Sequence, residues 1–142
     1  MDSSNPTVNY GTKTTLRADG SPTINSYLRF TVSGVAGTIT RVRLLIYANS
    51  SLNVGLNTQS VADNTWNETT MTWNTAPAIG GVLATSSSIA TGTWITFDVT
   101  NSGFVNGDGT YSFGITDPSA TAISLASRES GANAPQLIID TQ

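Results

Sequence analysis

Apolar and polar residues alternate along two clear stretches of the chain. In residues 26–32 every second position (Leu28, Phe30 and Val32) is apolar, and residues 41–47 show the same alternation. Side chains at alternate positions of a strand point to the same side of a sheet. The pattern therefore predicts two half-buried β-strands.

Seven further segments read as short strands: 12–18, 56–62, 81–87, 93–100, 110–116, 123–127 and 136–140. Turn-forming residues separate them, as at 19–22 and 106–109, and no stretch keeps a helical period. About nine short strands predict an all-β fold, an antiparallel β-sandwich of jelly-roll type. The length of 142 residues, with no linker or internal repeat, predicts one β-sandwich module over residues 1–142.

The composition excludes several kinds of chemistry. The chain has no cysteine and no histidine, so thiolate nucleophiles, imidazole bases and the usual zinc sites are absent. Only 11% of residues are charged, and abundant Thr, Ser, Asn and Gly are typical of secreted microbial β-domains. No apolar run reaches the roughly 18 residues of a membrane span. We therefore expect a secreted or extracellular protein without a membrane span.

The net charge of −3 conceals an asymmetry. Residues 1–47 contain five cations and two carboxylates (+3), whereas residues 48–142 contain one cation and seven carboxylates (−6). An acidic chain without a run of Lys or Arg is a poor partner for nucleic acid. The basic half is the part of the chain that could contact an acidic ligand.

One segment, residues 66–77 (WNETTMTWNTAP), combines two tryptophans, a carboxylate and a proline at fixed offsets. Other motifs precede and follow it in order along the chain: Asn9-Tyr10-Gly11, Tyr27-Leu28-Arg29-Phe30, the strand 42–47, Asp98-Val99-Thr100, Ser127-Arg128-Glu129 and Pro135-Gln136-Leu137. With these motifs, the chain resembles over nearly its whole length the DNRLRE domains. These are also called disaggregatase-related modules and are classified as carbohydrate-binding module family 96.

The resemblance implies a secreted, non-catalytic β-sandwich attached to polysaccharide-degrading enzymes or surface proteins. Alginate-type uronic acid polymers are among the ligands of such modules. We therefore expect a carbohydrate-binding module, excised from a larger secreted protein, that recognises an acidic polysaccharide and targets its parent. The alternative is a structural module of an extracellular surface or filament protein.

One departure from the family pattern concerns the N-terminus. Members usually have a first strand before the Asn-Tyr-Gly motif, whereas here only residues 1–8 precede Asn9, with Pro6 among them. The first family strand is therefore expected to be missing. An open sheet edge would recruit a strand from the same chain or from a second copy, unless another segment covers it.

Glu68 lies two residues after Trp66, so in an extended segment both side chains point to one side, and the carboxylate needs a cation. Arg43 or Arg29 is the expected partner, and the resemblance implies that these Arg and Glu positions are structural. Arg128 and Glu129 belong to the same expected set. The alternative, that Glu68 and Glu129 are the two carboxylates of a glycosidase, is disfavoured, and we expect no enzyme activity.

The candidate ligand-binding residues come from the basic half and from one tryptophan. If the strands at 12–18, 26–32 and 41–47 share a sheet, five of the six cations lie on one face with two tyrosines; if successive strands alternate between sheets, the face is split. Such a face suits a polyanionic glycan. The candidates are Lys13, Arg17, Tyr27, Arg41, Tyr47 and Trp94.

We expect no cofactor. The turn Asn106-Gly107-Asp108-Gly109 has oxygen ligands at calcium-like spacing but is typical of a hairpin. A structural calcium ion held by Asp98 or by backbone carbonyls remains compatible with the resemblance.

Overall fold

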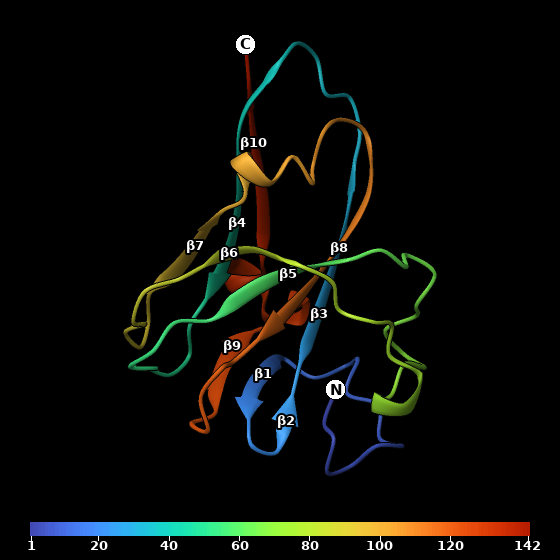
Figure 1. Cartoon of the computed structure of the whole chain (residues 1–142), viewed down its shortest axis with the longest axis vertical. Helices are drawn as coiled ribbons and strands as arrows, with labels where there is room; N and C mark the ends of the chain where they lie inside the picture. Colours follow the sequence, from blue (N-terminus) through green and yellow to red (C-terminus); the bar gives the residue numbers. More distant parts are fainter.

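The computed structural model describes the whole chain, residues 1–142, as ten strands and three short 3-10 helices (Figure 1). The strands are β1 (Thr15–Gly20), β2 (Thr23–Ile24), β3 (Ser26–Val32), β4 (Ile39–Tyr47), β5 (Asn57–Val61), β6 (Val82–Thr85), β7 (Trp94–Asp98), β8 (Gly109–Thr116), β9 (Ile123–Ala126) and β10 (Gln136–Thr141). The helices are η1 (Trp73–Thr75), η2 (Thr100–Ser102) and η3 (Arg128–Asn133). No helix has the length and apolar character needed to cross a membrane.

All nine predicted strands are present, so the all-β prediction is confirmed. The additional strand, β2, has two residues and forms a short hairpin with the end of β1. It was missed because two residues are too few to show an alternation.

The strands form two layers in the order of a jelly roll. One layer contains β2-β1-β9 and β10-β4-β7, joined by pairing of Ala48 with Leu125; the other is β3-β8-β5-β6. β9 and β10 therefore follow one another along the same side of β4, with η3 between them (Figure 1). The chain crosses to the opposite layer between β1 and β3, and again between β3 and β4.

One apolar core lies between the layers. The inward side chains expected from alternation in β4 and β7 are all buried, and they pack with side chains of β8 and β9. The fully buried side chains of these four strands include Val42, Leu44, Ile46, Phe97, Phe113, Ile115, Ile123 and Leu125. In β3, Leu28 is buried, whereas Phe30 is half-buried with its ring edge-on to Phe113.

A long connection between β5 and β6, residues 62–81, covers the outer face of the second layer. Ser112 and Gly114 of β8 point outward, yet both are buried. Trp66 donates its indole N–H to the hydroxyl of Ser112 at 3.0 Å, and Ile79 packs so closely on Gly114 that a Cβ there would lie 3.0 Å from the Ile79 side chain. The connection is therefore a fixed part of the fold, as the Trp66–Pro77 motif indicated.

The N-terminal residues pair with the edge of β2. Asp2 bridges to Ile24, and the backbone N–H of Asn25 donates to the carbonyl of Met1 at 2.9 Å. The outer edges of β3 and β10 have no strand partner. The outer edges of β6 and β7, at the other side of the sandwich, have no strand partner either, whereas the edge of β2 is covered.

Candidate functional site

A pocket lies between β1 and the start of β3. Its volume is about 440 Å³, and the N-terminal segment, the 62–81 connection and η3 form the remaining walls. Leu16, Ile24, Leu28 and Met71 line its apolar part. Three aromatic side chains, three cations and three carboxylates surround this part: Tyr10, Tyr27, Trp66, Lys13, Arg17, Arg128, Asp2, Glu68 and Glu129.

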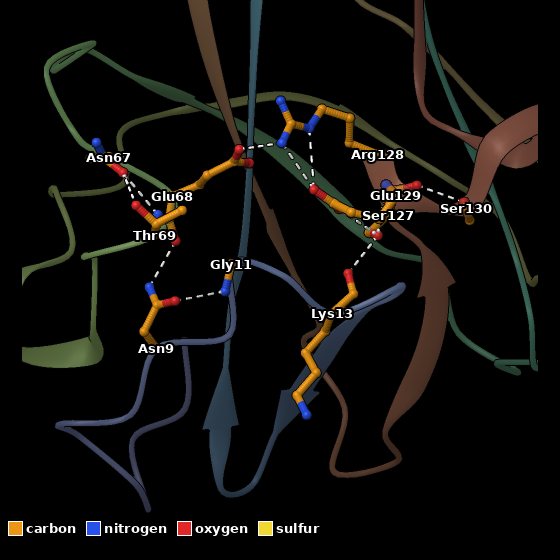
Figure 2. Close-up of polar contacts among 10 residues, drawn as sticks. All are labelled: Asn9, Gly11, Lys13, Asn67, Glu68, Thr69, Ser127, Arg128, Glu129 and Ser130. Carbon is orange, nitrogen blue, oxygen red and sulfur yellow. Dashed lines mark hydrogen bonds and ion pairs between the residues drawn. The ribbon is translucent and has the colours of Figure 1, made fainter.

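The Asn9-Tyr10-Gly11 motif attaches the N-terminal wall to the 62–81 connection (Figure 2). The Asn9 side-chain amide donates to the carbonyls of Glu68 and Met71 at 2.7 and 2.6 Å, and its oxygen accepts from the Gly11 N–H at 3.0 Å. A Cβ at position 11 would lie 1.8 Å from the Glu68 carbonyl oxygen. The motif thus requires glycine, because the two backbones touch there, and this contact places Tyr10 in the pocket wall.

Arg128 binds both glutamates of the chain (Figure 2). It forms an ion pair with Glu68 and another with Glu129, the latter at 3.0 Å. The expected partner of Glu68, Arg29 or Arg43, was wrong: Arg29 lies over Trp66, and Arg43 pairs with Asp140 at 2.9 Å. The sequence could not show the true partner, because η3, at the end of β9, comes close to the 62–81 connection only in the folded chain.

The environment of Glu129 favours its charged form. Burial opposes ionisation, but hydrogen bonds from Arg128 and Ser127 outweigh it and lower the pKa of this carboxyl. Ser127 also ties the wall to the N-terminal segment, since its hydroxyl shares its one hydrogen between the Glu129 carboxylate at 2.9 Å and the Lys13 carbonyl at 2.7 Å. Because its pKa is lowered, Glu129 is unsuited to the general acid role that glycoside hydrolysis needs.

Trp66 and Tyr27 form a supported aromatic wall. The guanidinium of Arg29 lies 4.6 Å from the Trp66 ring centroid, and Tyr27 meets the same ring edge-on at 6.2 Å. The Tyr27 hydroxyl donates to the Pro77 carbonyl at 3.1 Å, and burial raises the pKa of this hydroxyl. These contacts fix the rings before any ligand arrives.

Most of the cations are already engaged within the protein. Arg29 donates to the carbonyls of Asn64 and Trp66, whereas the other three engaged cations, Arg41, Arg43 and Arg128, have carboxylate partners. The side chains of Lys13 and Arg17 make no hydrogen bond or ion pair with the protein, and both line the pocket. The two cations with free charge therefore line the same pocket as the aromatic wall.

A family model describes nearly the whole chain: that of carbohydrate-binding module family 96 matches residues 1–141. The chain belongs to this family. No curated protein matches the chain. The protein is thus a carbohydrate-binding module, and such modules bind glycans without catalysing reactions.

The fold divides the candidate ligand-binding residues of the family 96 module into two groups. Lys13, Arg17 and Tyr27 line the pocket, whereas the other three, Arg41, Tyr47 and Trp94, lie on the outer face of β4 and β7. Of the two arrangements left open by the sequence, the structure has the split face, because β3 lies in the opposite layer from β1 and β4. This is the alternation between sheets that a jelly roll imposes.

Two pocket residues of the module were missed as ligand-binding candidates, Tyr10 and Trp66. The signal for Tyr10 was its place in the Asn-Tyr-Gly motif, whereas Trp66 was interpreted only as an anchor of the connection. In the structure Trp66 is both an anchor and a pocket residue: its indole N–H donates to Ser112, and its ring lines the pocket.

The residues considered for calcium are bound within the module. Asp98 accepts hydrogen bonds from Thr100 and Arg41, and Asp108 accepts from the backbone N–H groups of Gly34 and Val35. No three Asp or Glu side chains are close enough together to hold a metal ion. Asp108 anchors the loop between β3 and β4.

Proposed function

We propose that this family 96 module binds an acidic polysaccharide, a uronic acid polymer such as alginate, in the pocket between β1 and β3. The main support is that Lys13 and Arg17, the two cations without a protein partner, both line the pocket. Free cations can form charge-assisted hydrogen bonds with sugar carboxylates. An engaged cation would first have to give up its own partner.

The aromatic wall supplies the second half of the recognition. Tyr10, Tyr27 and Trp66 line the same pocket as the two cations. The C–H face of a pyranose packs well on such surfaces, while its carboxylate projects from the ring edge. Binding there would hold a secreted parent enzyme or surface protein on its polysaccharide and raise the local concentration.

Affinity electrophoresis in gels containing alginate or polygalacturonate tests the proposal. We expect the module to be retarded, and Lys13→Ala and Arg17→Ala each to weaken binding about fivefold, corresponding to about 1 kcal/mol per exposed charge contact. Raising the salt concentration should weaken it further. Arg41→Ala is the matched control, because Arg41 is on another face and pairs with Asp98 at 3.2 Å. Equal losses in all three variants, or no retardation, would contradict the proposal.

A second candidate function, self-association through strands, has one specific observation in its favour. A groove of about 480 Å³ lies between β3 and β10, two strands with an open edge, and is lined by Phe30, Val32, Leu137 and Ile139. The partner at this edge would be a second copy of the module. Antiparallel pairing of two β10 strands about Ile138 places Gln136 of one copy opposite Asp140 of the other, so no like charges face each other.

Sedimentation at high protein concentration tests this candidate. Ile138→Lys would set two lysines opposite each other and give monomers, whereas Gln136→Lys would meet Asp140 of the other copy and favour dimers. A parent protein that stays monomeric at millimolar concentration would exclude it.

A further inference from the structure

The outer faces of the two layers differ in what covers them. The face of β3-β8-β5 is covered by residues 62–81, whereas the outward side chains of β7 (Trp94, Thr96 and Asp98) are all exposed. Arg41 on the neighbouring strand β4 is exposed as well. We call the outer side of the sheet β10-β4-β7 the open face. It shares no residue with the pocket.

An aromatic pair lies at one end of the open face. Tyr47 and Trp94 are direct partners in the β4–β7 register, with ring centroids 5.4 Å apart and planes at 74°. Trp94 is 38% exposed and is the only aromatic residue among the exposed large hydrophobics. Because Tyr47 supports the indole edge-on, the exposed ring surface of Trp94 is fixed by its neighbour.

The polar atoms of this pair are free. The other three tyrosines, Tyr10, Tyr27 and Tyr111, use their hydroxyls in hydrogen bonds with the protein. The Tyr47 hydroxyl has no such partner, and neither has the indole N–H of Trp94. A ring surface beside two free donors matches a sugar, which offers a C–H face and hydroxyl groups at its edge.

The charges of the open face cancel. Arg41 pairs with Asp98 at 3.2 Å, and Arg43 with Asp140 at 2.9 Å, so two cations meet two carboxylates. No free charge remains to select an acidic sugar. The chemistry of this face therefore suits a neutral glycan.

We infer that the open face around Tyr47 and Trp94 is a second carbohydrate-binding surface, one for neutral glycans. A sugar ring stacks on the Trp94 indole, and the Tyr47 hydroxyl and the Trp94 N–H donate to its hydroxyl groups. This inference goes beyond the acidic-glycan proposal and does not depend on it, because the two surfaces share no residue. A module with both surfaces holds two kinds of polysaccharide at once, as in a mixed cell-wall matrix.

Affinity electrophoresis in gels of hydroxyethyl cellulose, xyloglucan and galactomannan tests the second surface. We expect retardation in at least one of these neutral gels, and a loss of about tenfold in affinity for Trp94→Ala, the size of one aromatic stacking contact. Tyr47→Phe removes only the hydroxyl and should cost about threefold. The retardation should be insensitive to salt, because no charge is involved.

Arg17→Ala is the matched control, since it alters the pocket and leaves the open face intact. It should keep neutral-glycan binding, and Trp94→Ala should keep any alginate binding. Absence of retardation in all three neutral gels, or equal retardation of the parent and Trp94→Ala, would overturn the inference. If the parent module binds a neutral glycan but not alginate, the acidic-glycan proposal is overturned and the inference of a second surface is not affected.

Discussion

Arg128 determines how much positive charge the pocket offers. Its guanidinium is shared between Glu68 and Glu129, so it is a link between the 62–81 connection and η3. The neighbouring cations Lys13 and Arg17 have no such partners. At the scale of single residues, charge that holds the wall is thus separate from charge that is free for a ligand.

Replacing Glu68 by Gln should make the pocket more favourable for an acidic glycan. The substitution removes one of the two carboxylates that bind Arg128, so the affinity for alginate should rise about two- to threefold, with a steeper salt dependence. Unfolding free energy should fall by no more than about 1 kcal/mol, because Arg128 is largely exposed.

Asp140→Asn is the control for this effect, since it removes a carboxylate from the other face. Isothermal titration of both variants with alginate oligosaccharides measures the difference. Weaker binding by Glu68→Gln than by the parent would show that Glu68 itself contacts the glycan.

Gly11→Ala should be strongly destabilising. The new Cβ would lie 1.8 Å from the carbonyl oxygen of Glu68, so the N-terminal wall would have to move away from the connection. We expect a loss of about 2 kcal/mol or more in urea unfolding. Gly81→Ala is the matched control, because nothing lies within 4 Å of a Cβ there; equal losses would mean that the contact at Gly11 is not tight.

At the scale of elements, the 62–81 connection behaves as a third layer over β3 and β8. Its anchors are polar as well as apolar: Trp66 donates to Ser112, and the Ser112 hydroxyl donates to the Asn64 side chain at 2.6 Å. Ser112 is fully buried beneath the connection. One hydroxyl therefore organises the start of the connection.

Ser112→Ala should loosen this element before it unfolds the sandwich. The indole N–H of Trp66 and the Asn64 side chain would lose a buried partner, which costs about 1–3 kcal/mol. Limited proteolysis should cleave within residues 62–81 faster than in the parent. Ser87→Ala, at an exposed serine whose hydroxyl has no protein partner, is the control. An unchanged cleavage rate would show that the apolar contacts suffice.

At the scale of the whole molecule, the charges favour stability at neutral rather than acid pH. Hydrogen bonds from Ser4 and Asn5 lower the pKa of Asp2 to about 2. Backbone N–H groups of Val35 and Gly34 lower the pKa of Asp108. The pKa values of Asp98 and Glu129 are lowered as well. A carboxyl whose pKa is lower in the folded state contributes stability above its unfolded pKa, near 4, and loses it as pH falls further.

Thermal unfolding should therefore be nearly independent of pH from about 8 to 5, with Tm falling between about pH 4 and pH 2. Asp108→Asn should be less stable than the parent at pH 7, and the difference should shrink as the pH falls and Asp108 becomes protonated. A difference that is constant over this range would show that the charge of Asp108 is not the cause.

The strands were predictable because they depend on local pattern. Inward positions such as Leu44, Ile46 and Phe97 repeat every second residue, and burying them on one side of a strand is the main driving force for the layers. The Trp66–Pro77 motif likewise identified the family from sequence alone. Alternation does not state which layer a strand joins, so Arg29 could not be separated from Arg17 and Arg41 before the fold was known.

The sequence by itself therefore determined the sandwich and the family, and it supplied part of the list of candidate ligand-binding residues. Only the tertiary structure decided how those residues are grouped. It joined Lys13 and Arg17 to Tyr10, Tyr27 and Trp66 in one pocket, and it placed Tyr47 and Trp94 on another face. The physical reason is that ion pairs and pocket walls form between residues up to about a hundred positions apart, as with Arg43 and Asp140. Only the pairing of distant strands brings such residues together.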